Sequence, residues 1–322
     1  MSDFWKPYPE LYNQLELVHK KTVEAVHDFP LLESIEPLLM QRGKMLRPAF
    51  LLIGSKYGKQ PDTIIDAAAA IELLHIATLL HDDVLDDAAL RRNVPTFHIS
   101  AGIKNAILAG DWLFAKSISL IAPMLKQDQI PILTTAAQRI CSSEIEQDIR
   151  KGKVFTSTRT YLRTIAGKTA ALITLALRSG AELAQAETAI KITLQRLGYN
   201  IGMAFQIQDD ILDYAGDTKN LQKPTGKDIY EGICTLPLIL ALQKATKQSS
   251  QQQIFNNSLP PLTNAYKSYY ENFVQKYNGI QDAVQFSKMY ITRANREIET
   301  LPQIPETEIL KDIVKRLIER QY

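Results

Sequence analysis

Residues 71–92 read IELLHIATLLHDDVLDDAALRR, and this stretch decides how the rest of the chain is interpreted. Its first part carries apolar residues at helical spacing, which predicts a core helix. Its second part places four aspartates within six positions and then two arginines. Carboxylates this close along a helix repel one another, so a purely structural role carries a cost. A positively charged ligand would remove that cost, which makes the stretch a candidate binding site.

Charge and composition exclude several classes of protein. The chain has 322 residues, 37 Lys and Arg against 35 Asp and Glu, and therefore no basic footprint for nucleic acid and no acidic tail. Its two cysteines, Cys141 and Cys234, lie in apolar or helix-like segments, which predicts a reducing compartment without disulfides. The start, MSDFWKPYPELYNQ, lacks a signal-peptide pattern, and no charge-free apolar run reaches 18 residues. We therefore expect a soluble, cytoplasmic protein without a membrane span.

Helical patterns cover most of the chain. Only 14 glycines occur, and no convincing strand pattern interrupts the helical segments. Helix ends are predicted at Gly58, Pro95 and the loop 216–228, and the polar stretch 244–263 is interpreted as a loop inside one bundle. The predicted helical segments lie near 10–28, 31–41, 45–57, 61–92, 104–125, 130–152, 159–179, 185–216 and 231–247. We predict an all-α fold in which one large helical bundle forms a single domain over residues 1–322.

The aspartate stretch has a near-repeat further along the chain. HDDVLDDAA at 81–89 and QDDILDYAG at 208–216 share the pattern Asp-Asp-x-x-Asp, and each follows a largely apolar helix. In a helix, positions i and i+4 share a face, and i+1 lies about 100° away. Each repeat therefore places its first and last aspartate together and its middle aspartate beside them: Asp82, Asp86 and Asp83 in the first, Asp209, Asp213 and Asp210 in the second. Together the clusters suggest two helices that face each other across a cavity.

The ligand type favours magnesium. Carboxylate-only ligation fits Mg²⁺ or Mn²⁺, and Mg²⁺ usually combines a few carboxylates with phosphate oxygens of a substrate, so a phosphorylated substrate is implied. A di-iron bundle would instead need two Glu-x-x-His motifs, and only Glu72 with His75 has that spacing. His75 lies two turns before Asp82, so we expect it to contact the ligand, with a core histidine as the alternative.

An ordered set of motifs resembles one family, the trans-type polyprenyl diphosphate synthases. The motifs are GKMLRP (43–48), IELLHIATLLHDDVLDDAALRR (71–92), GDWLFA (110–115), YLRTIAGKTA (161–170), GMAFQIQDDILDYAG (202–216) and KPTGKDIYEGICTLP (223–237). The resemblance implies an all-α isoprenoid-synthase bundle with a central cavity, a homodimer and three Mg²⁺ ions. It also implies the head-to-tail condensation of an allylic diphosphate (dimethylallyl, geranyl or farnesyl) with isopentenyl diphosphate.

The resemblance assigns roles to individual residues. The diphosphate leaving group needs concentrated positive charge, which the metals on the six aspartates would supply, with Asp82, Asp86, Asp209 and Lys168 as the catalytic set. The predicted allylic-diphosphate contacts are Arg91, Lys168, Thr169, Gln206 and Lys223. The predicted isopentenyl-diphosphate contacts are Lys44, Arg47, His75 and Arg92. Taken singly, these residues would also fit a solvated helix start, a simple turn or a core position.

Three positions depart from the family pattern. Asn93 stands where glycine usually follows the arginine pair, and asparagine tolerates a left-handed backbone better than most residues. Ser143 stands where glycine is common. Ile233 replaces the lysine that many members carry before Cys234, which predicts that one allylic-diphosphate contact is missing.

Product length is predicted from the residues just before the first cluster. Ala77 and Thr78 are small, whereas the family members that make short products resemble one another in carrying aromatic residues at these positions. A growing chain could then extend deeper, by roughly one helical turn per isoprenoid unit, so we expect a product longer than farnesyl diphosphate. The stretch resembles the hexaprenyl, heptaprenyl and octaprenyl groups. The alternatives are a geranylgeranyl diphosphate synthase or the catalytic subunit of a heptaprenyl synthase with a small partner subunit.

Two other classes are disfavoured. A terpene cyclase would share the first cluster but would mix Asn, Ser or Thr, and Glu in the second. A non-catalytic partner subunit would be expected to lose one cluster or Lys168, and the chain keeps them all.

Overall fold

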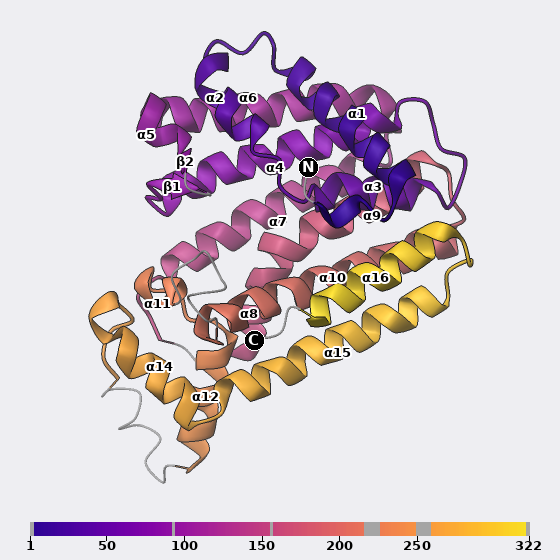
Figure 1. The fold of residues 1–322 in the computed structure, drawn as a ribbon. Helices are drawn as coiled ribbons and strands as arrows, with labels where there is room; N and C mark the ends of the chain where they lie inside the picture. The colour runs from indigo at the N-terminus through magenta and orange to yellow at the C-terminus, as the bar shows by residue number, and fades with distance from the viewer. Residues whose placement is uncertain (1–2, 92–93, 155–156, 216–225, 249–258, 320–322) are drawn as a thin grey trace. The chain divides into compact units, whose positions relative to one another are not determined.

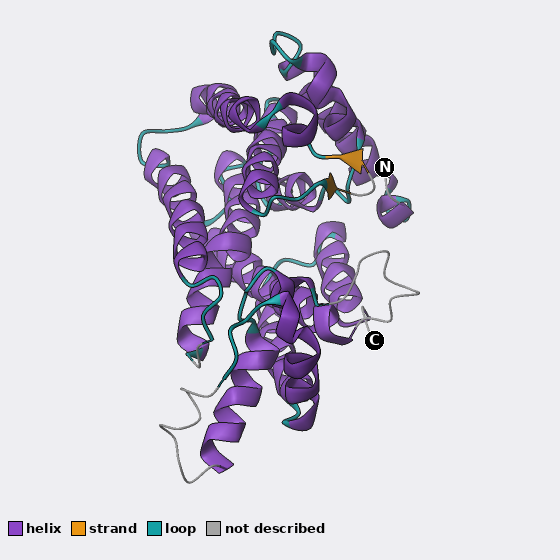
Figure 2. Ribbon diagram, turned by 90° about the vertical axis from the view of Figure 1, so that its left-hand side faces the viewer, coloured by secondary structure: helices purple, strands orange, loops and turns teal. Residues whose placement is uncertain are grey.

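Nearly all of the described chain is helical, and Figure 2 shows a single short hairpin beside the helices. The computed structural model describes residues 3–91, 94–154, 157–215, 226–248 and 259–319. They cluster into two compact units, the first formed by Met1–Ile132 with Leu175–Gln195 and the second by Leu133–Thr174 with Arg196–Tyr322. The all-α prediction is confirmed. The single domain over 1–322 stays a prediction.

The first unit contains the elements from the N-terminus to the start of α7 (Figure 1). They are η1 (Asp3–Trp5), α1 (Pro9–Ala25), α2 (Leu32–Met40), α3 (Leu46–Ser55), α4 (Ile64–Leu85), β1 (Leu90–Arg91), β2 (Val94–Pro95), α5 (Phe97–Ala101), α6 (Ile103–Ile121) and η2 (Ala122–Met124). Three longer helices contribute residues to both units: α7 (Ile130–Ile149), α9 (Ala171–Leu183) and α10 (Thr188–Ala215).

The second unit contains the remaining helices. They are α8 (Thr158–Ile165), the π-helical turn Ala166–Ala170, α11 (Lys227–Tyr230), α12 (Leu236–Gln248), η4 (Asn264–Tyr266), α14 (Lys267–Lys276), α15 (Gly279–Glu299) and α16 (Pro305–Glu319). The helices from η4 onward lie outside the segments predicted from the sequence. They are short or strongly amphipathic, with exposed charged faces, and so lack the long Ala- and Leu-rich runs that identified the others.

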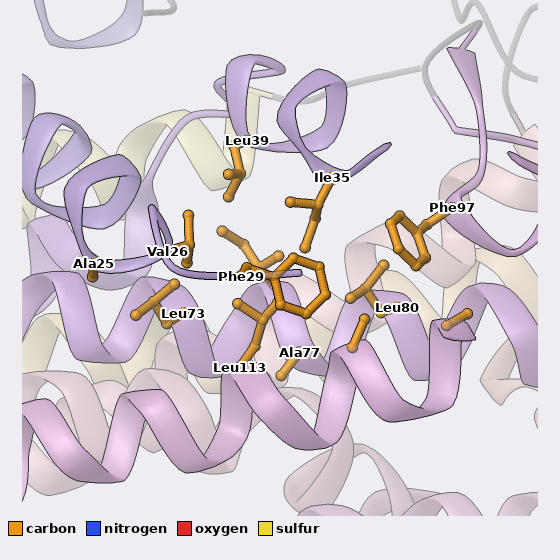
Figure 3. Packing of buried hydrophobic residues seen from close by; sticks show 13 residues of the cluster. Ala25, Val26, Phe29, Ile35, Leu39, Leu73, Ala77, Leu80, Phe97 and Leu113 are labelled. Atoms are coloured by element: carbon orange, nitrogen blue, oxygen red, sulfur yellow. The ribbon is translucent and has the colours of Figure 1, made fainter. Parts of the chain in front are cut away.

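The core of the first unit forms around α4, which packs along α6 (Figure 1). Helix α4 is apolar on most sides, and its run Ala67–Ala70 is almost fully buried, which allows neighbouring helices to approach closely. Figure 3 shows Phe29, Ile35 and Leu80 in the apolar cluster above it. Burial of each large side chain contributes about 1.5–3 kcal/mol, so this cluster holds the α4 end that carries the first aspartates.

The predicted helix 61–92 is too long. Helix α4 ends at Leu85, Asp86 caps it, and Asp87 adopts a left-handed backbone with φ 47°. A short polar side chain tolerates this conformation, which reverses the chain into the β1–β2 hairpin. The hairpin pairs Leu90 with Pro95 and Arg91 with Val94.

Two helices among the described residues are long and apolar enough to cross a membrane by length and composition alone. They are Ile64–Leu85 and Ile103–Met124. The first has 61% of its apolar window buried in the unit and is therefore a core helix, whereas the second has only 28% buried.

Candidate active site

The first aspartate cluster lies at the C-terminal end of α4. Asp83 is only 3% exposed and accepts hydrogen bonds from Arg91, with Nε 2.8 and 3.0 Å from its two oxygens and Nη2 2.7 Å from Oδ1. Asp82 and Asp86 are half-buried. The middle carboxylate is therefore neutralised by an arginine, and the outer two remain closer to solvent.

The hairpin places Arg91 beside Asp83. Buried Thr96 follows β2, and its hydroxyl donates to the Ala88 carbonyl at 2.6 Å while its backbone N–H donates to the Ala89 carbonyl at 3.1 Å. These bonds tie the returning strand to the end of α4 and so fix Arg91 above it. Arg92, predicted to bind isopentenyl diphosphate, lies outside the described residues, as does Asn93.

The second cluster ends α10 and is held by neutral groups. Asp210 is buried and accepts hydrogen bonds from the Tyr161 hydroxyl at 2.5 Å and from Gln206 Nε2 at 2.7 Å. Burial, with a smaller contribution from the charges of Asp209 and Asp213, raises the pKa of Asp210 to about 7. Asp209 is exposed and Asp213 half-buried. The middle aspartate is again held by side chains, and those given by the described part of the chain include no arginine.

Asp228 is a further carboxylate at this cluster that the sequence analysis missed. Asp213 accepts the backbone N–H groups of Lys227 at 3.0 Å and Asp228 at 3.1 Å, which brings the start of α11 onto the cluster. Burial and the charges of Asp210, Asp213 and Asp209 raise the pKa of Asp228 well above its usual range. Its signal in the sequence was the Gly-Lys-Asp at 226–228, where Gly226 has φ 75° and turns the chain back.

Two predicted allylic contacts, Thr169 and Gln206, come together next to Asp210, and a third, Lys168, precedes Thr169 in the chain. The Thr169 hydroxyl donates to Gln206 Oε1 at 2.6 Å, which continues the chain of hydrogen bonds through Gln206 to Asp210. Lys168 Nζ lies 3.0 Å from Glu144 Oε2 on α7. Lys168 and Thr169 lie in the π-helical turn, a feature that occurs often at functional sites. Lys223, the fourth predicted contact in this part of the chain, lies outside the described residues.

Close helix packing explains how the π-helical turn reaches the cluster. Gly167 lies against the Ser143 hydroxyl, which occupies the space that a Cβ at residue 167 would need. Gly202 on α10 similarly meets the backbone of Ala170. The serine that replaces the usual glycine at position 143 is buried and donates to the Arg139 carbonyl at 2.8 Å, so the structure accommodates this departure.

Two of the predicted isopentenyl-diphosphate residues of the first unit, Arg47 and His75, also meet. Arg47 Nη1 lies 3.0 Å from His75 Nε2, and Lys44 lies in the loop that enters α3. Burial lowers the pKa of the Arg47 guanidinium, while the charges of Glu72 and Asp82 oppose that shift. Arg47 Nε is buried and has no hydrogen-bond partner among the described residues. A buried N–H donor of this kind is available to bind an anion.

The residues predicted to set product length differ in exposure. Ala77 is 2% exposed and belongs to the apolar cluster of Figure 3. Thr78 is half-buried, and its hydroxyl donates to the His75 carbonyl at 2.8 Å. Ile233 donates its backbone N–H to the Asp228 carbonyl at 2.7 Å, so the position of the missing lysine adjoins the second cluster.

The carboxylates do not form a finished metal site. Within the described ranges, no group of three or more His, Cys, Asp or Glu side chains is gathered closely enough to hold a metal ion. The metal role of the six aspartates therefore stays a prediction.

Comparison with known proteins identifies the family. Residues 30–271 match the family model described as polyprenyl synthetase. The chain is 33% identical to heptaprenyl diphosphate synthase component 2 of Geobacillus stearothermophilus, covering 98% of each chain, and 31% identical to nonaprenyl diphosphate synthase of Mycobacterium tuberculosis, covering 89% and 86%. A heptaprenyl diphosphate synthase structure from Staphylococcus aureus superimposes with a TM-score of 0.88 at 28% identity, covering 97% and 99%. The chain belongs to the polyprenyl synthetase family, a class of prenyl-transferring enzymes that act on isoprenyl diphosphates.

Proposed function

We propose that the two aspartate clusters serve one reaction, the Mg²⁺-dependent head-to-tail condensation of an allylic diphosphate with isopentenyl diphosphate. The observation that carries this proposal is the shared design of the clusters. In each, the protein engages the middle aspartate, Asp83 or Asp210, and leaves the outer ones less buried. Carboxylates at i and i+4 on the more open side of a helix suit a hard divalent cation.

The donor set fits magnesium. Both clusters offer carboxylates as ligands, and the side chains that hold Asp210 in the second cluster, Tyr161 and Gln206, are neutral donors. Three bound Mg²⁺ ions, the number that the family resemblance implies, would supply the positive charge that stabilises the departing diphosphate. We assign the ligand role to the outer aspartates and assign Asp83 and Asp210 to holding the clusters in place.

Lys168 and Arg91 bind the allylic diphosphate in this proposal. Each already faces a carboxylate, Glu144 and Asp83 respectively, which fixes the cation before substrate arrives. A guanidinium carries five N–H donors, so Arg91 can keep Asp83 and still donate to a phosphate oxygen. Thr169 and Gln206 add neutral hydrogen bonds, and Lys223 would add a further charge.

Lys44, Arg47, His75 and Arg92 bind isopentenyl diphosphate without a metal in this proposal. The Arg47–His75 contact supports it, because the partly unsatisfied guanidinium lies where an anion would complete its hydrogen bonds. Its fork suits bidentate contact with a diphosphate, which a lysine would copy poorly.

Product length follows from the relatives and from Ala77 and Thr78. The heptaprenyl and nonaprenyl relatives support a product longer than farnesyl diphosphate. Thr78 is the more accessible of the two residues, so Thr78→Phe should shorten the product, and Ala77→Phe should do so at a cost in stability. An unchanged chain-length distribution in both folded variants would contradict this placement.

One incubation tests the reaction itself. The purified protein is incubated with Mg²⁺, labelled isopentenyl diphosphate and each allylic primer in turn, and the products are sized. We expect labelled prenyl diphosphates longer than farnesyl, and their loss on chelation. Products that stop at geranylgeranyl diphosphate, one unit beyond farnesyl, would support the geranylgeranyl diphosphate synthase alternative, and no product with any primer would contradict activity of this chain alone.

A homodimer is the proposed assembly. Helix α6 exposes Ile103, Ile107, Phe114 and Ile118 on one face, at 37–56% exposure, which a second copy of the chain would cover. Ile107→Glu should then lower the mass measured by light scattering to that of a monomer. The name "component 2" of the Geobacillus relative favours a second candidate, a catalytic subunit that needs a small partner. Inactivity of the pure dimer would support that candidate.

A further inference from the structure

The loop that carries Lys44 is held by the first residues of the chain. This loop, residues 41–45, connects α2 to α3. Trp5 of η1 is fully buried, and its indole Nε1 donates to the Lys44 carbonyl at 2.5 Å. The Tyr8 N–H donates to the Trp5 carbonyl at 2.9 Å, which joins the same residue to the start of α1. The buried indole therefore connects the N-terminal segment to the loop backbone.

The neighbouring residue contacts the Lys44 side chain. Lys44 Nζ lies 5.4 Å from the centre of the Phe4 ring, within the range of a cation–π interaction. The rings of Phe4 and Trp5 meet edge to face, with centroids 4.6 Å apart. One dipeptide thus contacts both the backbone and the ammonium group of Lys44. On α1, Glu16 adds a 2.6 Å ion pair to Arg42 in the same loop.

The loop needs such support because its backbone is strained. Met45 adopts a left-handed conformation with φ 48°, which is unfavourable for a long side chain without polar atoms. Helix α3 begins at the next residue and carries Arg47, which contacts His75. Fixing the Lys44 carbonyl therefore fixes the turn at Met45 and the direction in which Arg47 enters its helix.

We propose that Phe4 and Trp5 are positioning residues for the isopentenyl-diphosphate pocket. They act through Lys44 and the Met45 turn and do not touch the substrate. The inference rests on the proposed function of Lys44, Arg47 and His75. It concerns a segment that precedes residue 30, where the match to the family model begins, and therefore assigns a role to η1 that the family match does not include.

Two variants and a matched control test the proposal. Trp5→Phe keeps an aromatic ring and removes the indole donor, and Phe4→Leu removes the ring beneath the ammonium. Trp112→Phe is the control, because Trp112 makes the same two kinds of contact. Its ring centroid lies 4.9 Å from that of Phe29 and 5.3 Å from the Nζ of Lys116. We expect KM for isopentenyl diphosphate to rise about five- to tenfold in Trp5→Phe, the usual effect of one hydrogen bond, and about two- to fivefold in Phe4→Leu.

The expected pattern separates positioning from general destabilisation. KM for the allylic diphosphate and kcat should stay within about twofold of the wild-type values in both variants. Calorimetry with inorganic diphosphate in the absence of Mg²⁺ should show the same loss of affinity. If Trp5→Phe melts too early to assay, Phe4→Leu decides, because its partly exposed ring contributes less to the core.

The outcomes separate this inference from the proposed function. A wild-type protein that makes no prenyl product from isopentenyl diphosphate would contradict the proposed function, and the calorimetry would still test the positioning role. An active wild type whose Trp5→Phe and Phe4→Leu variants behave like Trp112→Phe would contradict only the role of η1. An equal rise in KM for both substrates would also overturn it.

Discussion

The two aspartate clusters share their spacing but are neutralised in different ways. In the first cluster, Arg91 contacts Asp83 through three N···O distances of 2.7–3.0 Å. The folded chain therefore places a positive charge beside this carboxylate. In the second, the described hydrogen-bond donors to Asp210 are the neutral groups of Tyr161 and Gln206, and Asp228 adds a further carboxylate nearby. The same sequence pattern therefore produces one cluster whose middle aspartate is paired with a guanidinium and one whose middle aspartate, among the described residues, is held by neutral donors.

The two clusters therefore share their spacing but differ in the charge of the groups that hold their middle aspartates. In the first cluster, the guanidinium of Arg91 supplies a positive charge beside Asp83 before any cation binds. The second can lower the repulsion between its carboxylates by binding protons or a cation. A bound divalent ion should thus change the second cluster more than the first.

Removal of an outer aspartate should have the largest effect. Asp82→Asn and Asp209→Asn should each lower kcat/KM about 10³-fold. Each removes a proposed ligand of the Mg²⁺ ions whose charge stabilises the leaving group. The measurement is steady-state kinetics at saturating Mg²⁺. Asp87→Asn is the matched control, since Asp87 lies outside the motif, is 97% exposed and has a left-handed backbone that asparagine tolerates. Equal losses in all three variants would contradict the assignment.

The second cluster should make stability depend on pH in the metal-free protein. The pKa of Asp210 is about 7 in the folded chain against an ordinary 3.8, so the folded state holds a proton that the unfolded state has lost between these values. The free energy of unfolding should therefore fall as pH rises from about 4 to about 7, by about 2–4 kcal/mol.

Denaturant titrations across this pH range provide the measurement. Asp210→Asn should flatten the decline, and Mg²⁺ should stabilise the wild-type protein more at pH 8 than at pH 5. A decline of the same size in the wild-type protein and in Asp210→Asn would show that other groups cause it.

The sequence predicted what depends on local spacing. The core position of α4 follows from its apolar run, and the pairing of Asp82 with Asp86 and of Asp209 with Asp213, expected from the i, i+4 spacing, stays a prediction. The end of α4 was missed because the left-handed turn at Asp87 has no glycine to mark it. The partners of the middle aspartates were missed because their contacts are not local: Tyr161 is 49 residues from Asp210.

Substitution of Asp83 should affect binding of the allylic diphosphate and not the Mg²⁺ dependence, in contrast to substitution of its neighbour Asp82. Asp83→Asn leaves Arg91 without its charged partner, so we expect KM for the allylic diphosphate to rise about 30-fold, in line with the loss of a hydrogen-bonded charge pair. The Mg²⁺ concentration at half-maximal activity should change little, because Asp83 is not a proposed ligand. A shift in Mg²⁺ dependence as large as that of Asp82→Asn would instead show that Asp83 is a metal ligand.

Tyr161 should give the smallest effect and the sharpest test of the second cluster. Tyr161→Phe removes one hydrogen bond to Asp210 and leaves the ring packing intact, so the half-saturating Mg²⁺ concentration should change about three- to tenfold. Tyr270→Phe is the matched control, because it also removes a buried hydroxyl in the second unit, one that donates to the Pro260 carbonyl. If the two variants shift Mg²⁺ dependence equally, the hydroxyl of Tyr161 has no special role. If only Tyr161→Phe shifts it, the protein sets the cation affinity of the second cluster through the residue that holds its middle carboxylate.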